Sequence, residues 1–431
     1  LRANHISLRV RQVDGSWRQT VKAETRIRGG LSNPIEVEGD VDGPLPDLRA
    51  VADTKLRRRL RKIIGSNQLK RLFETDVRRT TQTVSDTQGN HVEIAFDDAA
   101  IKSATDTEEF GELELELKRG RPNGLMEIVK LISQNDIPVR PSSYSKAERG
   151  YRLVLKESNA ALKPKKLKQS PLKAGQTAPK AFQALLEWTV EQVLHNWSVV
   201  LDDSDSEGPH QLRVGVRFLR TLLRAFRPVI DSEDLRVLER DLRALGRIVG
   251  ELRDLDVLSL EIVGNLDRPP ALAVGFNALD EDLTADTERQ RAAVRDALCS
   301  PDMQTLQFRL ALLPNQLGWE HVGSERSLTK KKIGPIARKA LNKSWRHARA
   351  LGRRIDELSI EERHDLRKKL KGLRYTLEAF SPIYDKNKCR RFIRDLKRLQ
   401  DIFGYLNDAT LAEQLHDRAG ESQDRDFHRA I

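Results

Sequence analysis

Hydrophobic periodicity divides the chain into two regions. Before about residue 157, six short runs alternate apolar with polar residues, which is the period-2 pattern of half-buried β-strands. Turn signals such as Asp14-Gly15 and Gln88-Gly89 separate these runs. After about residue 180, apolar residues recur every three to four positions, which indicates amphipathic helices. The runs that predict strands are ISLRVRQ, SWRQTVKAE, IEVEGDV, DVRRTTQTV, HVEIAFD and ELELELK.

This pattern predicts an α+β chain of two domains joined by a linker, in keeping with its 431 residues. Residues 1–157 are predicted to form an antiparallel β domain, with helical interruptions at about 48–71 and 122–135. Residues 158–180 combine Pro, Lys and Gly without periodicity, so they predict a solvated basic linker that like charges keep extended. Residues 181–431 are predicted to be all-helical. Because patterned sequence starts at the first residue, which is not Met, we expect the natural protein to extend upstream.

The helical region contains an internal duplication. Two similar segments, HQLRVGVRFLR and HDLRKKLKGLRY, begin at His210 and His364, which are 154 residues apart. The same offset relates DLRALGRIVGELRD to DLKRLQDIFGYLND further along. A register kept over about 45 residues predicts two similar helical bundles related by a pseudo-two-fold axis.

Each copy carries one helix with a basic face opposite an apolar stripe. A solvated face is the ordinary explanation for a single basic helix. Like charges at this spacing repel by about 0.2–0.5 kcal/mol per pair, however, and the chain tolerates this repulsion twice at equivalent positions. We therefore expect the two helices to line one groove for a phosphate-rich anion, which Arg binds through bidentate hydrogen bonds. The residues of the two basic faces are His210, Arg213, Arg217, Arg220 and Arg224, and His364, Arg367, Lys371 and Arg374.

Composition narrows the class of partner. Lys and Arg number 76 against 64 Asp and Glu, and the pI is about 9.6, so nucleic acid, polyphosphate and an anionic membrane surface are all compatible partners. Aromatic residues make up only 5% of the chain, which disfavours nucleic acid because single-strand binders stack bases on aromatic rings. No apolar run approaches the ~18 residues that span a membrane, so no membrane partner is expected.

The cysteines bear on the cellular compartment. Cys299 and Cys389 are the only two, and neither has a second Cys nearby. This argues against a disulfide framework and against a Cys-based zinc site. We therefore expect a cytoplasmic protein.

Charged residues are doubled on one face of most predicted strands. A solvent-exposed face explains any single strand, but half a dozen such strands favour a closed sheet with a charged interior. Carboxylates in such an interior suit Mg²⁺ or Mn²⁺, while Arg and Lys neutralise a phosphate chain. The basic residues on these strands are Arg9, Arg11, Lys22 and Arg79, and the acidic ones are Glu36, Glu38, Glu93, Asp97, Glu112, Glu114 and Glu116.

Residues 1–157 resemble the CYTH superfamily of triphosphate tunnel enzymes. The resemblance rests on ISLRVRQVDGSWRQTVK, VEIAFD, ELELELKRG and SKAERGYRL. It implies an eight-stranded antiparallel tunnel that acts on triphosphates with a divalent metal, Mg²⁺ or Mn²⁺. It also implies that Arg9, Arg11, Lys22, Arg79, Lys146 and Arg149 hold the triphosphate, and that Glu112, Glu114 and Glu116, with Glu36, Glu38, Glu93 and Asp97, hold the metal or order its waters.

The chain departs from the CYTH pattern in two places. The family's first-strand ExExK motif would lie before residue 1, and the ExExK at Glu114–Lys118 is on a late strand instead. Pro34-Ile35 also stands where the family has a basic residue. The metal ligands of that first strand are therefore missing from this sequence, and activity is expected of a longer protein.

Residues 181–431 resemble the CHAD domain. The resemblance rests on HQLRVGVRFLR, HDLRKKLKGLRY, GELRDLDVL and GYLNDATLA. It implies two helical bundles around a basic cavity that binds inorganic polyphosphate. The chain departs from this family at Phe218, where a second Arg is frequent.

Together these features predict an inorganic triphosphatase, like the bacterial CYTH-CHAD enzymes, that hydrolyses tripolyphosphate to diphosphate and phosphate and also binds polyphosphate. One alternative is a non-catalytic polyphosphate-binding protein with a degenerate tunnel. Others are a triphosphatase for thiamine triphosphate or nucleotides and, within the same superfamily, a class IV adenylate cyclase. An upstream ExExK strand would favour an enzyme, and its true absence would favour the binding protein.

Overall fold

The structure is a computed structural model of residues 1–431. It describes all of them except residues 26, 28, 136, 138, 158–161, 229, 267, 269, 271–272, 316–331 and 420–431, and it describes only the helix path for 404–419. The chain divides into two compact units, Leu1–Ala161 with Gln307–Leu312, and Leu162–Leu306 with Leu313–Ile431. Within these described ranges, every helix is too short or too polar to cross a membrane.

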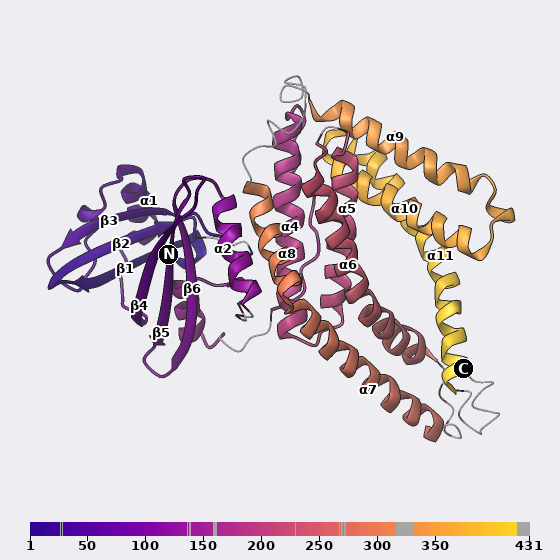
Figure 1. Cartoon of the computed structure of the whole chain (residues 1–431), viewed down its shortest axis with the longest axis horizontal. Helices are drawn as coiled ribbons and strands as arrows, with labels where there is room; N and C mark the ends of the chain where they lie inside the picture. The colour runs from indigo at the N-terminus through magenta and orange to yellow at the C-terminus, as the bar shows by residue number, and fades with distance from the viewer. Residues whose placement is uncertain are drawn as a thin grey trace. The chain divides into compact units, whose positions relative to one another are not determined.

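The first unit contains the six predicted strands, so the predicted antiparallel β fold is confirmed (Figure 1). The strands form two three-stranded antiparallel sheets, in the orders β1-β2-β3 and β4-β5-β6. In the part of the chain described, no strand pairing joins these sheets, whereas the resemblance implied one eight-stranded tunnel. The strands are β1 (Ile6–Val13), β2 (Ser16–Ala23), β3 (Ile35–Val41), β4 (Glu74–Ser85), β5 (His91–Lys102) and β6 (Thr107–Arg119).

One helix covers the apolar face of the first sheet. Helix α1 (Thr54–Ile64) begins at Asp53, whose carboxylate accepts a hydrogen bond from the Leu56 amide at 2.7 Å. Leu56 and Leu60 of α1 pack in one buried cluster with Ile6 and Val21 of the sheet. Because side chains alternate along each strand, the opposite face of this sheet is left with the charged residues of β1, β2 and β3.

Two further helices belong to the second sheet. Helix α2 (Asn123–Gln134) matches the helix predicted at about 122–135. Helix α3 (Lys146–Val154) was not predicted, and the Ser145 hydroxyl caps its first turn by accepting from the Glu148 amide. Gly150 lets α3 approach the sheet, since a β-carbon there would lie 2.3 Å from the Phe73 ring. This helix contacts β4 and β5.

The second unit is helical, as predicted. Helices α4 to α6 and α9 to α11 correspond at the 154-residue offset, so the duplication covers three helices per copy rather than the two segments noticed in the sequence. The helices from residue 178 onward, of which α8 falls partly in the first unit, are α4 (Ala178–Asp202), α5 (Glu207–Phe226), α6 (Glu233–Asp256), α7 (Ala273–Leu298), α8 (Pro301–Leu312), α9 (Ile333–Gly352), α10 (Ile360–Phe380) and α11 (Lys386–Ala419).

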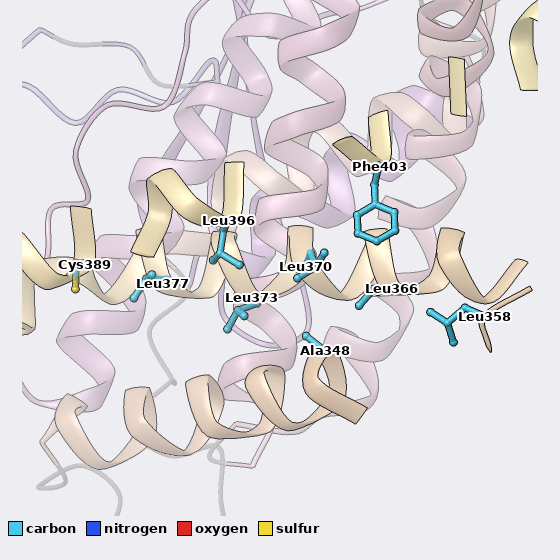
Figure 2. Packing of buried hydrophobic residues seen from close by; sticks show 9 residues of the cluster. All are labelled: Ala348, Leu358, Leu366, Leu370, Leu373, Leu377, Cys389, Leu396 and Phe403. Carbon is cyan, nitrogen blue, oxygen red and sulfur yellow. The ribbon is translucent and has the colours of Figure 1, made fainter. Parts of the chain in front are cut away.

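The two copies meet through equivalent residues. Phe226 ends α5 and Phe380 ends α10, and their ring centroids lie 6.0 Å apart. A contact between two equivalent residues is expected beside a two-fold axis. The apolar stripe predicted for each helix is buried, and Figure 2 shows the α10 stripe, including Leu366 and Leu373, packed with Ala348 of α9 and Leu396 of α11.

The described part of the predicted linker is irregular up to residue 177, where α4 follows, and it packs against helices instead of being freely solvated. The Lys165 amide donates to Asn196 Oδ1 at 3.0 Å, and the Asn196 side-chain amide donates back to the Lys165 carbonyl at 2.9 Å. Further along, the Ser170 hydroxyl donates to the Ala379 carbonyl at 2.7 Å, and Leu172 is buried. Charge repulsion is outweighed because buried polar groups of α4 satisfy the linker backbone, and Ser170 of the linker satisfies a backbone carbonyl of α10. Residues 158–161 of the predicted linker lie outside the described residues.

We expect Phe380→Ala to lower the free energy of unfolding of the full chain by about 3–5 kcal/mol, because it leaves a cavity where the two copies meet. Urea denaturation followed by circular dichroism measures this loss. Phe392→Ala is the matched control, since Phe392 of α11 is 37% exposed and should cost at most about 1.5 kcal/mol. Equal losses in the two variants would contradict the central packing role of Phe380.

Candidate functional site

Strand register brings opposite charges into one row across the second sheet. Arg79 of β4 is the partner of Asp97 in β5, and Asp97 is the partner of Glu112 in β6. Glu114 lies two residues along β6 and therefore shares this face. Lys146, at the start of α3, reaches the same row from the helix.

These five side chains form one ion network. Arg79 binds Asp97 with two hydrogen bonds, Nε to Oδ1 at 2.7 Å and Nη2 to Oδ2 at 2.6 Å, and it also reaches Glu114 at 2.5 Å. Lys146 Nζ lies 2.8 Å from Asp97 Oδ2, 2.7 Å from Glu114 Oε1, and in contact with Glu112. Each cation therefore bridges at least two carboxylates.

Burial and opposite charge compete within this network. Asp97 is 0% exposed, and burial alone would raise its pKa, but Arg79 and Lys146 hold the pKa below its ordinary value. The pKa of Glu114 is likewise lowered by Lys146 and Arg79 against the effect of burial. Burial lowers the pKa of Lys146, but the hydrogen bonds that its ammonium donates to the three carboxylates outweigh burial and raise this pKa. Asp97, Glu114 and Lys146 are thus ionised at neutral pH.

Three of these carboxylates could hold a metal ion. Asp97, Glu112 and Glu114 each offer an oxygen, and these oxygens lie within 4.8 Å of one another. An all-oxygen donor set of this kind fits Mg²⁺ or Mn²⁺. The structure does not bring Glu93 and Glu116 into this group. They are register partners of each other, two residues beyond Glu114 along β6, and they bind Lys118 at 3.4 and 2.7 Å.

The remaining predicted carboxylates lie on the first sheet. Glu36 binds Lys22 at 3.0 Å, and Glu38 binds Arg11 at 3.1 Å. In the register of β2 and β3, Glu36 is the partner of Lys22 and Glu38 is the partner of Thr20, and these ion pairs compensate the charges of the sheet locally. Arg9 lies 3.8 Å from Glu36.

Arg9 of the first sheet and Arg79 of the second sheet lie near enough for their charges to interact. Burial lowers the pKa of Arg9, and the neighbouring guanidinium of Arg11 lowers it further. The charge of Arg79 on β4 also contributes to this shift, so the cations of β1 and β4 lie close enough to repel. The first unit therefore concentrates cations from both sheets in one region.

Arg149, the second predicted basic residue of α3, has its own acidic partner. It binds Glu108 at 2.9 Å and lies over the Phe110 ring, 4.7 Å from the centroid. The sequence analysis missed Glu108. Its even spacing with Glu112 and Glu114 along β6 was the available signal.

In the second unit, α5 and α10 bring five cations together, which we call the helical basic cluster. Burial lowers the pKa of Lys371 to about 7, and the surrounding guanidinium groups lower it in the same direction. Two of these groups come from the other copy, so the predicted convergence of two basic faces is found for this part of the helices. The cluster consists of Arg213, Arg217, Arg367, Lys371 and Arg374.

Helix α6 supplies acids that the basic face of α5 itself lacks. Arg213 binds Asp254 at 2.7 Å and donates to the Gly250 carbonyl at 3.1 Å, while Arg224 binds Glu239 at 2.7 Å. The positive charge of α5 is therefore partly compensated by tertiary contacts.

Arg220 lies beyond the cluster on the same face of α5. Burial lowers its pKa, and the charge of Arg224 lowers it further. Its Nε atom is buried and has no hydrogen-bond partner among the described residues. A donor left in this state is available to an anion that enters beside it.

The two matched histidines differ in their surroundings. Burial lowers the pKa of His210, and the strongest charge acting on it is that of Arg253 of α6. His364 is more exposed, and its pKa is lowered by burial and by charges that include Lys371 and Arg217. Only His364 therefore adjoins the helical basic cluster.

Phe218 occupies the position where an Arg was expected from the resemblance. It is buried and packs edge-on against Trp188 at 5.1 Å between centroids, and it also contacts Tyr375 of α10 at 5.5 Å. An aromatic contact between the copies thus replaces a possible phosphate contact.

Comparisons with known protein families agree with the division of the chain into a β domain and a helical domain. The CHAD domain profile matches residues 184–417, and the CYTH domain profile matches residues 1–151. These matches confirm both resemblances predicted from the sequence.

Two individual proteins are similar to parts of the chain. The inorganic triphosphatase of Haemophilus influenzae is 31% identical over 154 residues, which cover 35% of this chain and 42% of that protein. The chain thus matches less than half the length of this relative. The crystal structure of the CHAD domain from the plant Ricinus communis superposes with a TM-score of 0.51 at 26% identity, covering 61% of this chain and 86% of that one.

We expect Asp97→Asn to weaken the dependence of stability on pH. Because the pKa values of Asp97 and Glu114 are lowered in the folded state, their ionised forms stabilise the fold at neutral pH, and this is lost as pH falls below about 4. At pH 7 the free energy of unfolding of the variant should be about 3–5 kcal/mol lower, since Arg79 and Lys146 lose a buried counter-charge. Urea unfolding between pH 3 and 7 measures both effects.

Asp98→Asn is the matched control for this experiment. Asp98 is the next residue of β5, is exposed on the opposite face and binds Arg78 at 2.6 Å. An exposed pair of this kind contributes at most about 1 kcal/mol. A pH profile of Asp97→Asn identical to that of the unsubstituted protein would contradict the assigned role of Asp97.

Proposed function

The chain belongs to the CHAD domain family and carries a CYTH domain before it, and from this we propose that it is an inorganic triphosphatase whose helical domain binds polyphosphate. The network of Arg79, Asp97, Glu112, Glu114 and Lys146 carries the enzymatic part of this proposal. It combines phosphate-binding cations with metal-binding carboxylates on one sheet face. The similarity to a protein named inorganic triphosphatase supports the same reaction class.

The cations of the first unit bind the substrate in this proposal. Arg79 and Lys146 exchange part of their contacts with carboxylates for contacts with phosphate oxygens. Because the pKa of Lys146 is raised, this residue stays protonated and acts as a fixed positive charge and not as a general base. The other triphosphate-binding residues are Arg9, Arg11, Lys22 and Arg149.

The carboxylates have a complementary role. Asp97, Glu112 and Glu114 would hold a divalent cation, Mg²⁺ or Mn²⁺, whose chemistry when bound is to polarise a phosphoryl oxygen and activate water. The bidentate contact of Arg79 with Asp97 fixes the orientation of that carboxylate. The sequence also assigned four other acids to the metal. In this proposal they form ion pairs with neighbouring Lys and Arg residues; these acids are Glu36, Glu38, Glu93 and Glu116.

A second candidate is a polyphosphate-binding protein without hydrolytic activity. One observation favours it: two cations already pair with all three carboxylates of the candidate metal site. We favour tripolyphosphate over thiamine triphosphate and nucleotides. The five side chains of the ion network are all charged, which suits a substrate that consists of phosphate alone.

We expect the natural full-length protein to release phosphate from tripolyphosphate faster than from ATP or thiamine triphosphate. Glu114→Gln should lower kcat by about 100-fold, since it removes one charged metal ligand. A phosphate-release assay with Mg²⁺ or Mn²⁺ measures both. Glu109→Gln is the matched control, because Glu109 is exposed on the opposite face of the same strand.

Two results would overturn parts of this proposal. Faster hydrolysis of ATP or thiamine triphosphate would refute the substrate assignment. Absence of hydrolysis, with polyphosphate binding intact, would favour the non-catalytic protein.

The helical basic cluster carries the polyphosphate-binding part of the proposal. Burial, with the repulsion of the neighbouring cations added to it, lowers the pKa of Lys371 to about 7, and a polyanion relieves this repulsion. Arg220, Arg224, His210 and His364 would extend the binding surface along α5 and α10. The solved CHAD domain supports this fold for the helical unit but leaves the ligand to experiment.

We expect the double variant Arg217→Glu, Lys371→Glu to bind polyphosphate at least about 10-fold more weakly, while tripolyphosphate hydrolysis is unchanged. Fluorescence anisotropy with labelled polyphosphate measures binding. Equal loss of binding and hydrolysis would contradict the division of labour between the two domains.

The Lys371→Arg variant tests whether the protonation of Lys371 controls polyphosphate binding. In the unsubstituted protein, affinity should fall between pH 6 and pH 9, because Lys371 loses its proton near pH 7 and must regain it to bind an anion. Arg stays protonated throughout this range, so the variant should bind with little dependence on pH. A similar decrease in both proteins would refute the role of Lys371.

A further inference from the structure

Helix α1 carries a strong positive charge that neither proposed site uses. Its eleven residues, TKLRRRLRKII, include six cations and no acid. The cations are Lys55, Arg57, Arg58, Arg59, Arg61 and Lys62.

The helix separates its apolar and basic sides completely. Leu56 and Leu60 are buried in the core of the first sheet, with Ile63 and Ile64 packed beside them. At 3.6 residues per turn, four of the cations, spaced i, i+3, i+4 and i+7, share one side of the helix away from this core, in a stripe about 10 Å long. All four side chains are exposed. The stripe, called the α1 stripe below, consists of Lys55, Arg58, Arg59 and Lys62.

The α1 stripe has no acidic partner in the described ranges of the chain. No ion pair there includes any of its four residues, and the one side-chain hydrogen bond is from Arg59 to the Asn4 carbonyl at 3.2 Å. Several other exposed cations of this unit are paired with acids, as Arg78 is with Asp98 at 2.6 Å. Like charges three and four residues apart destabilise a helix by about 0.2–0.5 kcal/mol per pair. An external polyanion would remove this cost.

The chemistry of the surface selects among polyanions. The apolar side of α1 is already buried against the sheet, so the helix cannot insert into a lipid surface. No aromatic residue occurs between residues 48 and 72, so the surface has no ring on which a base could stack. A flexible inorganic chain of phosphates needs only closely spaced cations, which the stripe provides.

We propose that the α1 stripe is a docking surface for long-chain inorganic polyphosphate. This inference rests on the proposed function, which assigns the same polyanion to the helical basic cluster. The stripe is separate from the triphosphate site, because α1 covers one face of the first sheet while Arg9, Arg11 and Lys22 lie on the other. It therefore strengthens the binding of long chains and leaves tripolyphosphate turnover unchanged.

The test measures binding of end-labelled polyphosphate to the full chain by fluorescence anisotropy at several salt concentrations. The Arg217→Glu, Lys371→Glu variant serves as background, so that the helical basic cluster does not mask the stripe. Adding Lys55→Gln, Arg58→Gln, Arg59→Gln and Lys62→Gln should weaken binding at least about 10-fold and reduce the slope of log affinity against log salt by about 3. Gln keeps a high helix propensity, and circular dichroism verifies the fold.

The matched control removes four other exposed cations of the first unit, namely Arg119, Arg121, Lys130 and Lys156. It should change the slope by less than about 1. An equal effect of the control, or an unchanged slope in the α1 variant, would overturn the proposal. So would tighter stripe-dependent binding of duplex RNA, or of vesicles containing phosphatidylglycerol, than of polyphosphate at equal phosphate concentration.

Tripolyphosphate hydrolysis by the α1 variant separates this proposal from the one on which it rests. Unchanged hydrolysis together with weaker polyphosphate binding supports the α1 stripe. If the unsubstituted protein does not hydrolyse tripolyphosphate, the proposed function fails, while the binding comparison still decides the role of the stripe.

Discussion

A fully buried carboxylate organises the first unit. Asp97 is 0% exposed, and an ion in that position is stable only with close counter-charges. Arg79 supplies one from the neighbouring strand, and Lys146 supplies the other from α3. The register of β4 with β5 and the position of α3 are therefore coupled: a shift of either would leave a buried charge without its partner.

Sequence pattern predicted the strands well but could not give their register. Glu112, Glu114 and Glu116 follow one another at even spacing, so the alternation alone makes them equivalent. Register separates them, because only Glu112 and Glu114 come near Asp97, while Glu116 binds Lys118. Helix α3 was missed because its nine residues are too few for a clear period of 3.6. The six described strands divide into two three-stranded sheets, and the alternation could not give this division, since pairing between strands leaves no local signal in the sequence.

The helical unit was predicted more completely because its signal is repeated. A constant offset identified the duplication, and the buried stripes of α5 and α10 agree with the periodicity. The acids that partly neutralise α5 could not be predicted from that helix. Asp254 and Glu239 belong to α6, and only packing determines which Arg each one meets. The separation of His210 from the helical basic cluster also depends on packing, although its sequence position matches that of His364.

The contact of Phe226 with Phe380 has an evolutionary meaning. In a symmetric dimer of identical chains, a substitution beside the axis appears on both sides at once, so a large side chain there meets its own copy. Fusing the two copies into one chain removes that restriction. Phe218 corresponds at the 154-residue offset to Gly372, and Tyr375, which Phe218 contacts, corresponds to Thr221. Gene duplication thus let one half acquire bulk where the other half stayed small, which a homodimer cannot do.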